Sequence, residues 1–126
     1  MARPSPVRDA VTDLIAAGDR HDWSIEDLVT ALGERRVDAN FSTVFRALGR
    51  LEEDGLVQRV ELGDGKARYE SAAGEHHEHV RCDRCGAVGA VPGCIVREAL
   101  PRVQKLTGFR VTGHQVLFSG LCPRCS

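Results

Sequence analysis

The residues best suited to chemistry gather in one short segment, residues 75–86, which reads EHHEHVRCDRCG. It holds three of the five histidines and two of the five cysteines of the 126-residue chain. So many nitrogen, oxygen and sulfur donors serve no purpose in an apolar core, whereas together they are typical metal ligands. A second cysteine pair lies in LCPRCS, residues 121–126. The sequence therefore predicts a metalloprotein.

Both cysteine pairs have the Cys-x-x-Cys spacing of zinc knuckles. Four thiolates suit tetrahedral Zn²⁺, with Zn–S bonds of about 2.3 Å. Residues 86–121 separate the pairs, a longer interval than in a zinc ribbon, so the tertiary fold has to bring them together. A redox dithiol is the alternative, and reducing surroundings favour metal. We predict a structural zinc site formed by Cys82, Cys85, Cys122 and Cys125, and interpret Cys94 as a buried structural thiol rather than a ligand.

The histidines supply two further ligand sets if their segment is a β-strand. Alternate side chains of a strand share a face, so the odd-numbered and even-numbered positions of HHEH point in opposite directions. A glutamate in the preceding strand and a histidine farther along the chain can each complete one set. A solvated polar linker is the alternative, but it explains this alternation poorly. The two expected sets are Glu70, His77 and His79, and His76, Glu78 and His114.

Three short helices are expected to precede this segment. Apolar spacing predicts a first helix from residue 7, which ends before Gly18. Ser24 and Asp27 have the spacing of a capping box that starts a second helix. The third helix is expected over residues 42–54, with an inward apolar stripe. Strand patterns at 56–62 and 66–71 then flank Gly-Asp-Gly and predict a hairpin, which completes the order of a winged helix-turn-helix.

The outer face of the third helix is suited to DNA. Residues 35–50 carry four arginines against one aspartate, a local +3 within residues 1–69, whose net charge is −3. Arginine can bind guanine in a bidentate manner, and an apolar ring can contact a thymine methyl. The alternative is that the ring packs on a neighbouring helix and the arginines are solvated. We predict DNA contacts from Ser42, Thr43, Phe45, Arg46 and Arg50 of the helix and from Lys66 and Arg68 of the hairpin.

The second half of the chain predicts a small α+β unit. Residues 87–93 resemble a strand and a turn, and residues 95–108 have a helical pattern. Pro101 interrupts that pattern, so the helix is expected either to kink there or to begin at the proline. Further strands are expected within residues 109–121. A unit of this size would gain from a metal ion or from dimerisation.

Composition limits the other classes of function. The chain has no apolar run near the roughly 18 residues of a membrane helix, and its start, MARPSP, lacks the apolar segment of a secretory signal. We therefore expect a cytoplasmic protein with no membrane partner and no small-molecule substrate. A metalloenzyme is one rival class, but no Ser-His-Asp set or phosphate loop supports it. A zinc-ribbon module that does not bind DNA is another.

Taken together, the motifs resemble those of the ferric uptake regulator family over nearly the whole chain. They are STVFRALxxLExxGLV, HHEHVxCxxCG, GFxVxxH and GLCxxC, in this order. The resemblance implies a winged-helix DNA-binding domain at residues 1–70, a metal-binding hinge at 71–79 and a dimerisation domain at 80–126. It also implies a homodimeric repressor that binds inverted-repeat, A·T-rich, double-stranded operators when a regulatory metal is bound.

The resemblance also assigns site residues by position. The four paired cysteines match the structural zinc site, and Glu70, His77 and His79 match the metal-sensing hinge site. The fourth hinge ligand comes from the loop before the second helix, where Asp22 fits by register and His21 precedes it by one residue. The second site matches at His76, Glu78 and His114, but its usual helix glutamate aligns with Arg97, with Glu98 one residue away.

Two departures from the family pattern concern the DNA contact and the metal. Phe45 replaces a tyrosine of the recognition helix, and Ala90 stands where iron and manganese sensors often place a carboxylate. A hinge site with two histidines and two carboxylates is nearest to four-coordinate zinc. The segment CDRCGAV also resembles zinc uptake regulators. We predict Zn²⁺ at both the structural and the regulatory site. The alternatives are a regulator that responds to iron, manganese or nickel, and a peroxide sensor that oxidises its own histidine.

Overall fold

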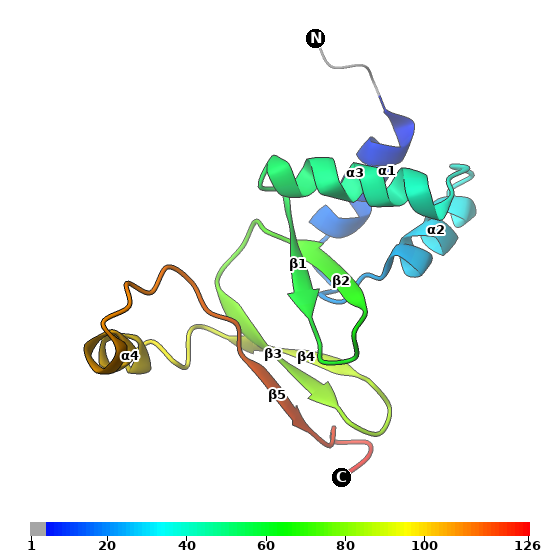
Figure 1. Ribbon diagram of the computed structural model, residues 1–126. Helices are drawn as coiled ribbons and strands as arrows, with labels where there is room; N and C mark the ends of the chain where they lie inside the picture. Colours follow the sequence, from blue (N-terminus) through cyan, green and yellow to red (C-terminus); the bar gives the residue numbers. More distant parts are fainter. Residues whose placement is uncertain (1–4) are drawn as a thin grey trace. The chain divides into compact units, whose positions relative to one another are not determined.

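The computed structural model describes residues 5–126 and divides into two compact units, unit 1 up to Gly74 and unit 2 from Glu75 (Figure 1). Unit 1 contains α1 (Pro6–Ala16), α2 (Ile25–Glu34), α3 (Phe41–Glu53), β1 (Val57–Glu61) and β2 (Ala67–Ser71). Unit 2 contains β3 (His77–Cys82), β4 (Val88–Pro92), α4 (Ala99–Thr107) and β5 (Leu117–Gly120). The predicted α+β class, with three helices and a hairpin before a small α/β unit, is confirmed.

Each helix of unit 1 begins at a residue whose side chain caps it. Ser5 accepts a hydrogen bond from the Arg8 N–H at the start of α1. The predicted capping box of α2 is confirmed, because Ser24 and Asp27 each accept from the other's backbone N–H. Asn40 caps α3 through the Thr43 N–H. That cap starts α3 one residue earlier than predicted, since it satisfies an N–H that otherwise has no helical partner.

The core of unit 1 is apolar and fully enclosed. Side chains from all three helices and both strands meet in it. Each fully buried aliphatic side chain contributes about 1.5–3 kcal/mol relative to an exposed one. The members exposed by 1% or less are Val11, Ile15, Leu28, Leu32, Val44 and Leu48.

A short backbone bridge ties the segment before α2 to β2. Trp23 and Tyr69 exchange both backbone hydrogen bonds, at 3.0 and 2.8 Å. β2 in turn pairs antiparallel with β1, so that Gln58 lies opposite Glu70. Three segments far apart in the sequence therefore meet around residues 69 and 70.

Unit 2 is built on a three-stranded sheet in the order β4-β3-β5. β3 pairs antiparallel with β4 and parallel with β5. Of the strands predicted in residues 109–121 only β5 forms, so that prediction is wrong for residues 109–116. α4 lies apart from the sheet, and all of residues 101–110 are exposed (Figure 1). Pro101 lies in its first turn, where no helical N–H is lost, so the helix is not kinked there.

No helix among residues 5–126 combines the length and the apolar character needed to span a bilayer.

Candidate metal centres and DNA-binding face

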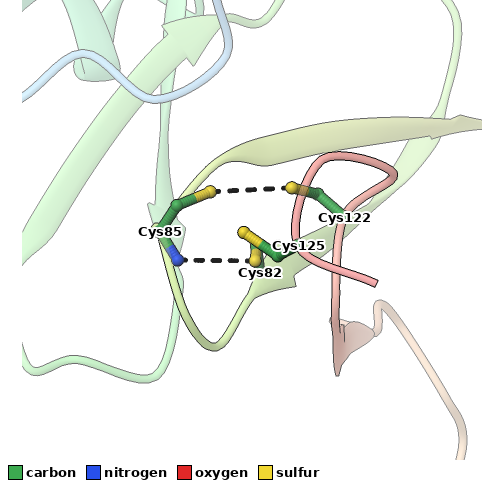
Figure 2. Close-up of side chains that lie close together, drawn as sticks. All are labelled: Cys82, Cys85, Cys122 and Cys125. Carbon is green, nitrogen blue, oxygen red and sulfur yellow. Dashed lines mark hydrogen bonds between the residues drawn. The ribbon is translucent and has the colours of Figure 1, made fainter.

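The four paired cysteines converge at one end of the unit 2 sheet. Cys82 ends β3 and lies opposite Gly120 of the parallel strand β5, so the two Cys-x-x-Cys turns that follow are adjacent (Figure 2). All four sulfur atoms lie within 4.8 Å of one another. The Cys85 and Cys122 Sγ atoms are 3.7 Å apart. A tetrahedron with Zn–S bonds of about 2.3 Å has edges of about 3.8 Å, so the donor set fits zinc.

Backbone hydrogen bonds prepare this cluster to lose protons. The Cys85 N–H donates to the Cys82 Sγ at 3.4 Å, and this bond, together with backbone hydrogen bonds from Cys122 and Arg84, lowers the pKa of Cys82 to about 6. The neighbouring Cys122 side chain instead raises the pKa of Cys125 to about 12. One thiolate therefore forms readily, whereas further negative charge needs a cation. Zn²⁺ provides that cation and displaces the remaining protons.

A second cluster forms around Glu78 of β3, on the face opposite to that of His77 and His79, as the alternation predicted. The Glu78 Oε1 lies 2.6 Å from the His76 Nε2 and 2.7 Å from the His114 Nε2. Glu78 is 3% exposed. Burial by itself raises the pKa of this carboxyl, but hydrogen bonds from the two histidines outweigh that effect, and the pKa is lowered. A buried carboxylate is thus held ionised between two imidazoles.

The fourth member of this cluster is Cys94, and Glu98 is not part of it. The Cys94 Sγ lies 3.7 Å from the His114 Nε2. Cys94 is half-buried, so the prediction that this thiol is buried is wrong. Glu98 is the residue immediately before α4, and its side chain makes no capping hydrogen bond. The sequence did not predict this contact, because only the folded chain shows the distance between Cys94 and His114.

Unit 1 presents two of the predicted hinge residues as a pair. The His21 Nδ1 is 2.8 Å from the Glu70 Oε2, and the Gln58 Nε2 donates to the other Glu70 oxygen at 2.7 Å. Glu70 is fully buried. Asp22, the residue favoured by register, instead accepts from the Arg20 Nε at 2.9 Å. The backbone bridge at Trp23 therefore directs His21 toward Glu70.

Unit 2 presents the other two hinge residues. His77 and His79 lie on one face of β3, with ring centroids 4.8 Å apart. Ala90 of β4 lies directly opposite His79 in the strand pairing. A carboxylate at position 90 would thus stand beside these histidines, and alanine offers no ligand atom there.

The outer face of α3 carries the predicted DNA-contacting residues. Phe45 is 54% exposed and stacks on Phe41, with ring centroids 6.4 Å apart and planes 9° from parallel. Phe41 was missed, although its i, i+4 spacing from Phe45 was visible in the sequence. Three other predicted residues on this helix, Ser42, Arg46 and Arg50, are exposed. Thr43 is half-buried.

The two predicted hairpin contacts differ from each other. Lys66 is exposed and lies at the turn. The Arg68 side chain is only 17% exposed and pairs with Asp64 at 2.8 Å. Because its guanidinium is held by its own turn, Arg68 is poorly placed for a phosphate, and Lys66 is the better candidate.

Comparisons with known proteins agree with these features. The sequence model described as "FUR: Ferric uptake regulator family" matches residues 2–119. The chain belongs to the ferric uptake regulator family. A ferric uptake regulation protein of Legionella pneumophila is 31% identical over 118 residues, which are 94% of this chain and 87% of that protein. This regulator is therefore a metal-responsive transcription regulator that binds DNA.

Solved structures show the same fold. The ferric uptake regulator of Francisella tularensis with iron has a TM-score of 0.85 at 22% identity, covering 98% of this chain and 94% of that one. A zinc uptake regulator complexed with zinc and DNA has a TM-score of 0.68 at 27% identity, covering 98% of this chain and 83% of that one.

Proposed function

We propose that this regulator is a cytoplasmic homodimer that represses transcription by binding an inverted-repeat, A·T-rich operator when Zn²⁺ occupies the hinge site. The main observation behind the proposal is that the hinge ligands are divided between the two units. Unit 1 holds one preformed pair, His21 and Glu70, and unit 2 holds another, His77 and His79. A single ion bound by both pairs would cross-link the DNA-binding unit to the other unit.

The donor set favours zinc. We take His21 rather than Asp22 as the fourth ligand, because Asp22 is engaged by Arg20 while His21 contacts Glu70. Three imidazoles and one carboxylate suit four-coordinate Zn²⁺. The absence of a ligand atom at Ala90, opposite His79, argues against the higher coordination number that iron and manganese prefer.

The four-cysteine cluster is proposed as the structural zinc site. Its ligands come from two turns that the β3–β5 pairing brings together, and the Arg84 guanidinium of one turn donates to the Cys125 carbonyl of the other at 3.4 Å. Zinc bound there would hold the end of β5 to the rest of unit 2, and its binding free energy would become folding free energy.

Exposed apolar side chains in unit 2 support the homodimer. They include Val103, Leu106 and Phe109 in and after α4, at 42%, 74% and 75% exposure, and Leu117 and Phe118 of β5 at 37% and 40%. A gathering of large apolar residues on one small unit is typical of an interaction surface. A second copy of the chain would cover this surface and hold two recognition helices at a defined spacing.

The proposed mechanism is thermodynamic linkage. If the metal binds only one relative arrangement of the two units, it shifts the population toward the arrangement whose dimer fits both operator half-sites. A coupling of about 1–3 kcal/mol would change operator affinity about 5- to 150-fold. By reciprocity, operator DNA would tighten metal binding at the hinge by the same factor.

The test is operator binding by fluorescence anisotropy, with and without added Zn²⁺. His79→Ala is expected to abolish the zinc-dependent increase in affinity and to leave the dimer and the cysteine-bound zinc in place. Glu75→Gln is the matched control, since this exposed residue adjoins the ligand segment and lies in neither ligand set. A normal zinc response in His79→Ala would refute the hinge assignment.

The names of the relatives favour a second candidate, in which the regulatory metal is iron. The same titration with Fe²⁺ and Mn²⁺ under anaerobic conditions separates the two. The iron candidate predicts a stronger operator response to Fe²⁺ than to Zn²⁺.

A further inference from the structure

We propose that Cys94 is a metal ligand, and that unit 2 contains a second zinc site in which a thiolate acts with His76, Glu78 and His114. This inference goes beyond the hinge site and beyond operator binding. It assigns a chemical role to the one cysteine outside the Cys-x-x-Cys pairs. It also accounts for the arginine at position 97, where the resemblance led us to expect a carboxylate ligand.

The distances fit a tetrahedral ion with one sulfur ligand. With Zn–N bonds of about 2.0–2.1 Å and a Zn–S bond of about 2.3 Å, tetrahedral edges are about 3.3 Å for N···N and about 3.6 Å for S···N. The two Nε2 atoms of His76 and His114 are 3.2 Å apart, and the Cys94 Sγ is 3.7 Å from the His114 Nε2. The Glu78 contacts of 2.6 and 2.7 Å are hydrogen-bond lengths, so the carboxylate would have to move outward on metal binding.

The backbone brings Cys94 to this position. Gly93, which follows β4, has a φ of +78° and donates its N–H to the His76 carbonyl at 3.0 Å. This bond turns the chain back toward β3, and Cys94 comes next. Arg97, by contrast, is exposed and carries a positive charge. The Cys94 sulfur, from the turn after β4, would thus replace the carboxylate ligand that the resemblance led us to expect at position 97.

Burial of Glu78 is the second, independent observation. Unit 2, all of whose residues are described, buries only two side chains, and Glu78 is one of them. Among residues 5–126 its ion-pair partners are His76 and His114, with no arginine or lysine. A buried carboxylate needs a cation or several hydrogen bonds to offset its desolvation. A divalent cation satisfies Glu78, both imidazoles and the thiolate together.

The competing explanation is a hydrogen-bonded triad without metal. In that arrangement both Nε2–H groups donate to one Glu78 oxygen, and Cys94 has no role. The thiolate decides which metal the site would prefer, because sulfur ligands favour Zn²⁺ over the harder ions Mn²⁺ and Mg²⁺.

Co²⁺ titration of protein that carries zinc in the four-cysteine site and at neither of the other two sites tests the proposal. Zinc already fills the four-cysteine site, and the hinge ligands contain no sulfur. A thiolate-to-cobalt charge-transfer absorption would therefore report Cys94 alone. We expect this absorption in the wild type and in His79→Ala, and its loss in Cys94→Ser and His114→Ala. Loss of a direct ligand should weaken Co²⁺ binding by at least the roughly 10–100-fold that loss of an outer-shell partner costs.

Cys94→Asp provides the matched variant. It restores a carboxylate, so it is expected to bind Co²⁺ without the charge-transfer absorption and to bind Mn²⁺ more tightly than the wild type does. Zinc content and circular dichroism, measured for every variant, verify that the four-cysteine site and the fold are intact. Absence of the absorption in the wild type, or its persistence in Cys94→Ser, would overturn the proposal. Neither result involves operator DNA, so the proposed function would stand or fall separately.

Discussion

In unit 1 the buried side chains are almost all apolar and come from three helices and a hairpin, whereas in unit 2 the two buried residues are Glu78 and Cys82. Each of these belongs to a candidate metal cluster. Large apolar side chains of unit 2, such as Leu106 and Phe109, are instead exposed. The apolar residues of one unit thus fill its own core, and those of the other are available to a partner.

The difference follows from size. A unit of residues 75–126 is too short to enclose much apolar surface, and the proposed metal ions and dimer contacts would supply the stability that its core does not. Within residues 5–74, unit 1 buries one carboxylate deeply, that of Glu70, which contacts His21 and Gln58, and otherwise it relies on hydrophobic burial. We therefore expect the two units to respond to different perturbations.

Removal of the structural zinc should have the largest effect. Cys82→Ser, or a strong chelator, is expected to unfold unit 2 and leave unit 1 folded, because structural zinc contributes about 10–16 kcal/mol in small zinc-dependent peptides. Hydrogen exchange would show loss of protection in β3, β4, α4 and β5, and none in unit 1. The one tryptophan, Trp23, lies in unit 1, so its fluorescence should not change. Unfolding of both units together would refute the claim that only unit 2 depends on zinc for its stability.

A cavity in the apolar core should act on unit 1 alone. Leu48→Ala removes a fully buried side chain and is expected to lower the free energy of unfolding by about 2–5 kcal/mol, with no change in zinc content. Denaturant titration followed by Trp23 fluorescence measures this loss. Leu106→Ala is the control, because Leu106 is 74% exposed and its truncation should change the stability of a single chain by no more than about 0.5 kcal/mol.

Truncation of an exposed aromatic residue separates association from folding. Phe109→Ser is expected to weaken dimerisation by about 1–3 kcal/mol, which is about 5- to 150-fold in Kd. Sedimentation analysis measures the constant. Phe45→Ser is the control, since this ring is also exposed but lies on α3 of unit 1. An equal loss of dimer in both variants would refute the assignment of the dimer interface to unit 2.

The smallest effect is expected at the start of α2. Asp27→Ala removes the capping box and should cost about 1 kcal/mol at neutral pH. Burial opposes ionisation of Asp27, but hydrogen bonds from Ser24 and the Arg20 guanidinium outweigh it and lower the pKa below the ordinary 3.8. The carboxylate's contribution is therefore full above pH 3.8 and is lost as the pH falls through the lower folded-state value.

Thermal unfolding of this variant and of the wild type across that pH range measures the effect. The difference in stability between Asp27→Ala and the wild type should become smaller in acid. Glu26→Ala, which alters an exposed neighbour in the same turn, should show a smaller difference. A gap between Asp27→Ala and the wild type that widened in acid would contradict the assigned direction of the pKa shift.

Local sequence was sufficient to predict the capping box, the hairpin and the alternation of ligand residues along β3. The capping box at Ser24, the glycine turn of the hairpin and the alternation of HHEH each depend on residues a few positions apart. Backbone geometry and side-chain period act over that range, so the printed sequence already contains them.

Contacts between distant segments required the folded chain. His21 lies at Glu70, and Asp22 does not, because Trp23 pairs with Tyr69 across 46 positions (69 minus 23). Cys94 reaches His114 because Gly93 bonds back to His76. Sequence spacing specifies neither contact, since a one-residue change of register would present a different side chain at each site.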